Sequence, residues 1–486
     1  MSASSEIISY PEPSSVLTEK PSVKKYLKYL GFFGPGAIVA SLTLGQGQLI
    51  LGPQIGALLG FSLLWLITIN VGSYLIAYTS CRFTMLSGIS VLDLFAFKTK
   101  KGWFNWLILI IMLIFIPIFA ASIMTSLGQA LMWIFGFGHY LWWGIGVSLM
   151  AAFLFLFGKY RLLEYTQAVF VAVLAVGAIV AVVLIQPDYG EIIPHFFRIG
   201  LDVPSEYPSW ISQVDGFKPT PIPLLMLGYL GTLTFTLITL VGYLGWIKEK
   251  KLGIFRNEKD SHAFSDSLFS LFKKQGKITY LPDEPEELRK SRKLLLPLKI
   301  DLVFAFIIVS VVSASYMIAG SYLLGPQDGT ILLPSDAQLI ETQGEIFSSI
   351  ASWMLPLFKL GVFFALFGTI YAGLEAATRM LYEILQTLNK TVKTFEYQRF
   401  MLYTILYILV AGIPLAILMY KGLSVLLMLS LTLMFLGVFG VIVYGVSAVY
   451  LSQKVLPSQY RLKPVGLLIT VIGIVLLCIP LLFLIG

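Results

Sequence analysis

Long apolar segments dominate this chain, and they restrict its fold more than any other feature. Each is long enough to cross a hydrocarbon layer of about 30 Å. Because lipid offers no hydrogen bonds to the backbone, segments of this kind predict helices. We therefore expect an all-α integral membrane protein with about eleven transmembrane helices. The segments are 30–59, 61–81, 104–135, 141–158, 163–186, 223–247, 301–324, 355–388, 400–420, 423–451 and 465–485.

Charged residues are scarce, and their distribution predicts an orientation. They make up 12% of the chain, against roughly 25% in soluble domains. The net charge of +8 arises largely from 248–299, which holds thirteen lysines and arginines, whereas acidic residues prevail in 187–222 and 325–345. Loops rich in Lys and Arg stay in the cytoplasm. We predict a multi-pass protein of the cell (plasma) membrane, with a cytoplasmic N-terminus, an extracellular C-terminus and no nucleic-acid partner.

The order of segments predicts a division of the chain into parts. Interruptions in the first and sixth segments suggest two five-helix repeats of inverted topology. The predicted parts are a cytoplasmic N-terminal segment (1–29), a first repeat (30–186), an extracellular loop (187–222), a second repeat (223–451, including a cytoplasmic loop at 248–299) and a last span (465–485). Within the cytoplasmic loop, 263–274 has apolar residues at helical spacing and ends in lysines, which predicts a short helix lying on the inner leaflet.

The first apolar segment contains a run that is poorly suited to a continuous helix in lipid. Glycine weakens a helix, and unpaired backbone groups cost several kcal/mol in hydrocarbon. A helix broken at mid-membrane is typical of the substrate site of a transporter. The run supplies these candidate substrate-binding residues: Thr43, Gly45, Gln46, Gly47 and Gln48.

The sixth segment repeats this irregularity. Glycines and threonines follow one another in the middle of its apolar stretch, so substrate would bind between the two breaks, near the membrane midplane. The alternative is that these small residues only allow close helix packing. The candidate residues of this segment are Gly231, Thr232, Thr234, Phe235 and Thr236.

Few ionisable residues lie within the predicted spans. Glu375 and Arg379 are four residues apart and share one helical face, so they form either a packing ion pair or a proton or cation carrier tuned by the arginine. Lys359 either extends to the outer surface or replaces a coupling cation. Asp301 and Glu164, at inner span ends, are expected to cap helices or pair with nearby basic residues.

The first segment also resembles a known family, the Nramp (natural resistance-associated macrophage protein) transporters of divalent metals. Its opening and its continuation after the break are similar to that family, and weaker similarities follow at the end of span 2 and the start of span 5. The resemblance implies a LeuT-type fold with a 5+5 inverted repeat, discontinuous helices 1 and 6, and secondary active transport. The similar residues are Phe33-Gly34-Pro35-Gly36, Gln54-Ile55-Gly56-Ala57, Gly60-Phe61, Leu63-Leu64-Trp65, Arg82, Ser87-Gly88 and Arg161-Leu162-Leu163-Glu164.

The metal-binding motifs of that family are missing, which marks the chain as similar to a divergent branch. Gly45 stands where the family has aspartate, and Gln48 where it has asparagine. The family's Met-Pro-His stretch falls on 235–237, so Phe235 replaces the methionine. The acidic residues of span 3 have no counterpart around 122–125, and Leu431 occupies the position of a glutamine in span 10. The usual ligand positions are thus uncharged.

The donors that remain are carbonyls, amides and hydroxyls, which leave the substrate open. We predict a secondary active transporter working by alternating access, with a divalent metal cation implied by the resemblance. The alternatives are a small organic solute (amino acid or carboxylate), Na⁺-coupled solute transport, and a transport-inactive membrane sensor. Either H⁺ or Na⁺ could be the coupling ion. We expect no cofactor and no enzyme activity, because no His, Cys or paired-carboxylate constellation shares a membrane cavity.

Overall fold

The computed structural model describes residues 7–20, 22–45, 47–158, 160–213, 219–324, 340–341, 344 and 352–484. Within these residues the chain is helical and contains no strand. In the described part of the chain, nine helices are long and apolar enough to cross a membrane, and two bent helix pairs raise the number to as many as eleven. The predicted all-α fold with about eleven spans is confirmed.

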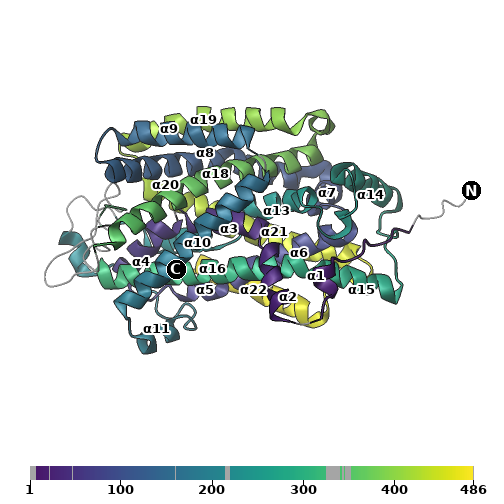
Figure 1. The fold of residues 1–486 in the computed structure, drawn as a ribbon, viewed down its shortest axis with the longest axis horizontal. Coiled ribbons are helices and arrows are strands. Elements are labelled where there is room, and N and C mark those ends of the chain that lie inside the picture. Colours follow the sequence, from purple (N-terminus) through teal and green to yellow (C-terminus); the bar gives the residue numbers. More distant parts are fainter. Residues whose placement is uncertain are drawn as a thin grey trace, which may run out of the picture.

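The spans follow the predicted order, and Figure 1 shows most of them running side by side along the long axis of the molecule. Spans 1 to 5 are α3–α4 (Pro35–Leu44 and Gly52–Leu59), α5–α6 (Trp65–Ile69 and Val71–Ser87), α8 (Trp103–Phe135), α9 (Tyr140–Phe157) and α10 (Tyr160–Ile185). Spans 6 to 11 are α12–α13 (Ile222–Leu233 and Leu237–Glu249), α16 (Leu296–Leu323), α18 (Met354–Leu388), α19 (Tyr397–Tyr420), α20–α21 (Val425–Leu433 and Gly440–Val455) and α22 (Pro464–Leu482).

Within the described residues, spans 1, 6 and 10 are interrupted by several residues, two of them where the sequence predicts it, whereas in span 2 only Asn70 separates α5 from α6. In span 1, α3 ends at Leu44 and the chain continues through a π-helix at Gly47–Leu51. In span 6, non-helical residues at 234–236 separate α12 from α13. The third interruption is a π-helix at Met434–Phe439 in span 10, which the sequence analysis missed. A π-helical turn inserts residues without breaking an apolar pattern, so composition alone does not reveal it.

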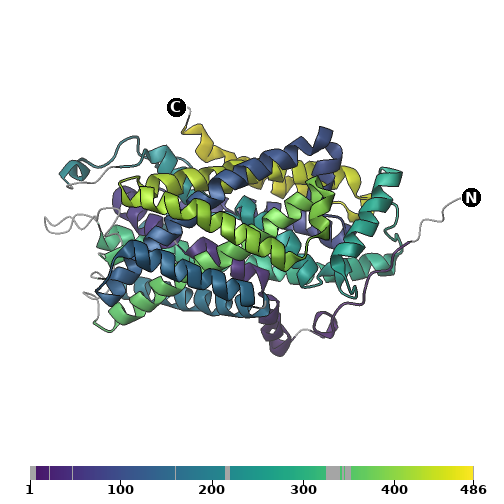
Figure 2. The ribbon, with the colours of Figure 1, turned by 90° about the horizontal axis from the view of Figure 1, so that it is seen from above.

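The connecting segments gather at the two ends of the bundle. One end carries the N-terminal helices α1 (Ser15–Thr18) and α2 (Val23–Tyr29) together with α7 (Val91–Lys98), α14 (Ser261–Gln275) and α15 (Pro285–Leu294). The opposite end carries α11 (Tyr189–His195), and the view from above in Figure 2 shows the same separation. The lysine-rich loop 248–299 thus lies at the same end as the N-terminal segment, and we refer to this end of the bundle as the inner end.

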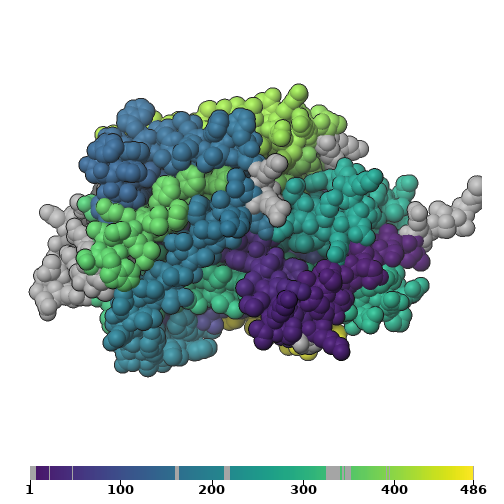
Figure 3. Space-filling view, viewed as in Figure 1, coloured from purple at the N-terminus to yellow at the C-terminus, as the bar shows by residue number. Residues whose placement is uncertain are grey.

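The N-terminal segment packs against this loop, as the neighbouring purple and teal surfaces in Figure 3 show. Tyr10 is buried, its amide donates to Glu287 at 2.6 Å and its hydroxyl donates to the carbonyl of Leu86 at 2.8 Å. Lys290 pairs with Glu12 at 2.6 Å. The inner end of span 2 is therefore covered by both segments.

Helix α14 exists where predicted, but its apolar face contacts protein rather than lipid. Leu268 and Phe272 are buried, Phe272 packs edge-on against Phe97 of α7, and Ser265 donates to the carbonyl of Gly88 at 2.6 Å. Our expectation of a helix lying on the inner leaflet was wrong. An amphipathic pattern requires an apolar surface opposite but does not say whether lipid or another helix supplies it.

Candidate functional site

The breaks in spans 1 and 6 meet in direct contact at the centre of the bundle. Gln48 is fully buried, and its amide nitrogen donates to the hydroxyl of Thr232 at 2.7 Å. The Thr232 hydroxyl in turn donates to the carbonyl of Tyr229 at 2.7 Å. A methyl group on Gly47 would lie 2.3 Å from the Thr232 side chain, so only glycine allows this approach.

Span 10 closes the site from a third side. A β-carbon on Gly437 would lie 2.5 Å from the α-carbon of Gly231, so the two backbones are in close contact. Thr234 donates to the carbonyl of Gly437 at 2.7 Å. The π-helix of span 10 thus supplies an acceptor to the break in span 6. The glycines at 231 and 437 allow close packing of the two spans, and Thr234 hydrogen-bonds the backbone of span 10.

The peptide groups freed by the break in span 6 find partners on span 2. Asn70 donates to the carbonyl of Leu233 at 2.8 Å, and the amide of Phe235 donates to Ser73 at 3.1 Å. Thr236 caps the following helix by accepting from the amide of Thr239. Asn70 and Ser73 were missed by the sequence analysis, although two polar residues in an apolar span are a usable signal.

Another candidate of span 1, Gly45, faces span 8. A methyl group on Gly45 would lie 1.4 Å from the hydroxyl oxygen of Thr369, so the two residues are in tight contact. Thr43 is buried. Gln46 lies outside the described residues. Phe235, fully buried, packs edge-on against Tyr74 with ring centroids 5.0 Å apart.

Glu375 and Arg379, the two charged candidates in the middle of span 8, are paired with each other. Arg379 donates to one Glu375 oxygen from two nitrogens, at 2.9 and 3.0 Å, and Trp246 donates to the same oxygen at 3.2 Å. The guanidinium also stacks on the Tyr397 ring, 4.3 Å from its centroid. Lys359 lies over the Trp133 ring at 4.8 Å. All these groups lie away from the contact between the two breaks.

The inner end of span 1 is held by a carboxylate from span 7. Asp301 is buried and accepts from the amides of Gly34 and Gly36, both at 2.8 Å, while Tyr243 of span 6 donates to it as well. Asp301 therefore caps α3, as the sequence analysis expected of it. Glu164 pairs with Lys250 beside Gly34, which also matches expectation.

A polar cavity of about 340 Å³ lies at the inner end of the bundle, between α7, α14 and the inner ends of α13 and α18. In it Lys248 pairs with Glu383 at 2.7 Å, and His262 of α14 lies 3.9 Å from the other Glu383 oxygen. Burial, followed by the charge of Lys248, lowers the pKa of His262, while Glu383 opposes this shift. The cavity wall also includes Asp93.

The central contact presents neutral oxygen and amide groups to a ligand. Within the described residues, no group of three or more His, Cys, Asp or Glu side chains could hold a metal ion. The oxygens and amides at the breaks belong to Gln48, Thr232, Thr234 and Thr236. Such donors suit a cation that keeps part of its water shell better than a fully dehydrated transition metal, which prefers sulfur or imidazole.

Comparison with known proteins gives a consistent family and fold. The sequence profile of the family described as natural resistance-associated macrophage protein-like (Nramp) matches residues 36–485. A segment of 173 residues is 27% identical to the divalent metal cation transporter MntH of Latilactobacillus sakei. That segment covers 34% of this chain and only 37% of the relative, little more than a third of its length.

Solved structures extend the similarity over nearly the whole chain. The manganese transporter of Eremococcus coleocola, in complex with an aromatic bis-isothiourea compound, matches with a TM-score of 0.64 at 17% identity and covers 97% of this chain and 89% of its own. Mhp1, a nucleobase-cation-symport-1 transporter closed around bromovinylhydantoin, matches with a TM-score of 0.51 at 12% identity, covering 93% and 89%. The fold is thus the LeuT type, with discontinuous helices 1 and 6.

Proposed function

This chain belongs to the Nramp family, and from that membership we propose that it is a secondary active transporter of a divalent metal cation, working by alternating access. The family match covers most of the chain, and the relative MntH, which is similar over 173 residues, is described as a divalent metal cation transporter. The observation that carries the proposal is the direct contact between the breaks of spans 1 and 6.

The cation would pass between the two breaks while part of its water shell remains. In this arrangement Gln48 and Thr232 hydrogen-bond each other, so the cation replaces that contact when the two breaks separate. The Thr234 and Thr236 hydroxyls supply further oxygens. An attraction of about 4 kcal/mol per unit charge pair is lost without a carboxylate, so we expect binding weaker than at a charged site.

The same proposal gives the chain an orientation and an internal symmetry. We place it in the plasma membrane with the N-terminal segment and loop 248–299 in the cytoplasm, since that end carries the basic residues. Spans 1–5 and 6–10 form the two repeats, and span 11 follows them. The proton and Na⁺ are the candidate coupling ions.

A flux assay in proteoliposomes tests this proposal. Uptake of Mn²⁺ and Mg²⁺ is measured with and without pH and Na⁺ gradients, beside a panel of amino acids and small carboxylates. We expect gradient-driven metal uptake, lost in Gln48→Leu, where the amide that lies between the breaks is gone. Uptake of an organic solute without metal uptake would reject the substrate, and metal binding without flux would reject transport.

A matched pair of glycine variants separates the site from general helix packing. Gly47→Ala places a methyl group 2.3 Å from Thr232, whereas Gly146→Ala in span 4 meets nothing within 4 Å. We expect Gly47→Ala to abolish metal uptake and Gly146→Ala to preserve it. Equal uptake by both variants would show that the cation does not pass between these breaks.

A further inference from the structure

A groove that opens toward the membrane runs between the last two spans, α21 and α22. It has a volume of about 610 Å³, and its walls are almost entirely apolar. Both helices pack against α6 of span 2. A β-carbon on Gly445 of α21 would lie 2.5 Å from Ile76, and one on Gly473 of α22 would lie 2.9 Å from the α-carbon of Gly72. Because each helix is fixed closely to α6, the two do not close on each other, and the groove remains between them.

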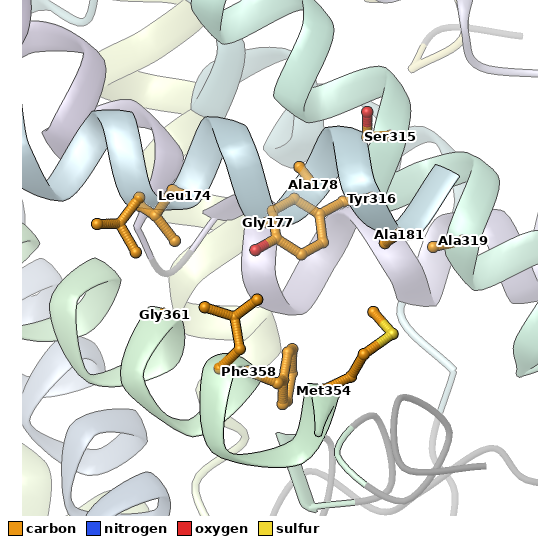
Figure 4. Close-up of a pocket in the computed structure, with 12 residues that line it drawn as sticks. Leu174, Gly177, Ala178, Ala181, Ser315, Tyr316, Ala319, Met354, Phe358 and Gly361 are labelled. Atoms are coloured by element: carbon orange, nitrogen blue, oxygen red, sulfur yellow. The ribbon is translucent and has the colours of Figure 1, made fainter. Parts of the chain in front are cut away.

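This groove differs from the crevice shown in Figure 4, on which side chains of α10, α16 and α18 converge, among them Leu174 and Phe358. That crevice has a volume of about 30 Å³, which is room for a water molecule. The α21–α22 groove is far larger, and Val446, Tyr450 and Val475 on its walls are exposed. Apolar surface of this kind on a transmembrane helix faces lipid, so the groove is accessible to an acyl chain.

One end of the groove carries hydrogen-bond donors. Lys454 lines it at the end of α21, and the ammonium group of this lysine donates to the Tyr450 hydroxyl at 3.2 Å. Lys463 is exposed and immediately precedes α22, four residues before Leu467 of the groove wall. Gln453 also lines the groove, and its amide nitrogen is shielded from solvent without a hydrogen-bond partner. Such an unpaired donor is disfavoured, so an acceptor from outside the chain is expected there.

The charge that the two helices carry at this end is entirely basic, since residues 397–486 contain no Asp or Glu. The loop between α21 and α22 lies at the inner end of the bundle, because its Tyr460 packs against Tyr10 of the N-terminal segment. Asp283 and Glu287 of loop 248–299 act electrostatically on Tyr460, but neither lines the groove. In the orientation proposed above, the groove opens to the cytoplasmic leaflet, whose anionic lipids attract basic residues at the membrane surface.

We propose that the α21–α22 groove binds an anionic phospholipid of the inner leaflet. One acyl chain lies in the groove, and the phosphate accepts hydrogen bonds from Lys454, Lys463 and the amide of Gln453. Lys454 keeps its hydrogen bond to Tyr450, because an ammonium group has three donors. The length of the groove agrees with this arrangement, since Val446 lies eight residues before Lys454, about 12 Å along the helix. That distance is most of the depth of one leaflet, which is half of about 30 Å.

Thermal unfolding of the purified full chain in detergent tests this site without any transport measurement. The unfolding midpoint is followed while phosphatidylglycerol, which is anionic, or phosphatidylcholine, which is zwitterionic, is titrated into the micelles. We expect phosphatidylglycerol to give a saturable rise that phosphatidylcholine does not give. Lys454→Gln and Lys463→Gln should each raise the half-saturating concentration of phosphatidylglycerol about fivefold. Val471→Trp fills the groove and leaves both lysines in place, so it should abolish the rise.

Lys100→Gln is the matched control, because Lys100 is also exposed and lies just before a span, α8, at the inner end. It should leave the half-saturating concentration unchanged, and inorganic phosphate, which has no acyl chain, should not reproduce the rise. Equal midpoints with the two lipids, a full response in Val471→Trp, or the same rise with inorganic phosphate would overturn the proposal. An equal loss of affinity in Lys100→Gln and in the two groove variants would also overturn it, since the lipid would then be attracted by the whole basic end.

Discussion

The centre of the bundle and its inner end are built from opposite kinds of interaction. At the centre, the breaks of spans 1, 6 and 10 are joined through neutral groups, such as Gln48 with Thr232. At the inner end, spans 1 and 6 are held by charges: Asp301 of span 7 accepts from the amides at the start of α3, and Lys248 of span 6 pairs with Glu383 of span 8. Neutral hydrogen bonds are worth about 1 kcal/mol net, and those to charged groups about twice that.

This difference indicates which contacts can exchange partners during transport and which cannot. A neutral amide and hydroxyl can release each other for a cation at small cost, whereas separating a buried ion pair leaves uncompensated charge. The charged contacts therefore hold the inner ends together in this conformation, and the neutral centre is where a ligand can enter. Four predictions test this contrast on the scale of folding stability.

Asp301 should have the largest effect. Asp301→Ala leaves the amides of Gly34 and Gly36 and the Tyr243 hydroxyl without their acceptor, and we expect a loss of about 3–5 kcal/mol. The unfolding midpoint in detergent measures it, with Glu284→Gln, an exposed acid at the start of α15, as the control. A loss no greater than that of the control would show that the Asp301 carboxylate does not stabilise the inner end.

The ion pair of span 8 should come next, and a double-mutant cycle measures it. Glu375→Gln and Arg379→Gln should each destabilise strongly, while the double variant should lose less than the two together, with a coupling of about 2 kcal/mol. Such coupling supports a packing role for the pair. Additive stability losses combined with altered pH dependence of transport would instead favour Glu375 as a proton carrier.

The central contact should matter little for folding. Thr232→Val keeps the shape of the side chain and removes two neutral hydrogen bonds, one with Gln48 and one with the carbonyl of Tyr229, so we expect a loss of about 2 kcal/mol or less. Metal uptake should nevertheless fall at least tenfold, since the hydroxyl lies between the two breaks. Comparison of the unfolding midpoint with the uptake rate checks this, and parallel losses in both would contradict the contrast.

His262 should give the smallest effect. Its pKa is lowered in the folded protein, so the unfolded chain binds the proton more readily. The stability it contributes is therefore present above the unfolded pKa of about 6.5 and lost as pH falls below it. His262→Gln should flatten the decline of the unfolding midpoint between neutral and mildly acidic pH, and an unchanged decline would exclude this residue as its source.

Much of this architecture could be predicted because lipid cannot hydrogen-bond to the backbone, so the spans must be helices. The spans, the breaks in spans 1 and 6, and the roles of Asp301 and Glu164 at inner helix ends all follow from local sequence. The predicted end of span 2, at 81, lies before the end of α6 at Ser87. Instead, Arg82 lies within α6, and its guanidinium donates to the carbonyls of Tyr460 and Arg461.

What the sequence could not provide are the partners across helices. Nothing local indicates that Asn70 pairs with the break in span 6, or that Gly437 approaches Gly231, because both contacts depend on how spans 2, 6 and 10 pack. Likewise, nothing local indicates that Thr369 occupies the space that any side chain at position 45 needs. We expect Gly45→Leu to disturb the packing of spans 1 and 8.

The most direct test of the central claim is the affinity for Mn²⁺ of Gln48→Glu, measured as the half-saturating concentration for uptake. The substitution preserves shape and places a carboxylate between the two breaks. If the cation passes there, its affinity should rise by about a hundredfold, and far less in the control Gln54→Glu, which lies in α4 beyond the break. An unchanged affinity in Gln48→Glu, or an equal rise in the control, would contradict the account.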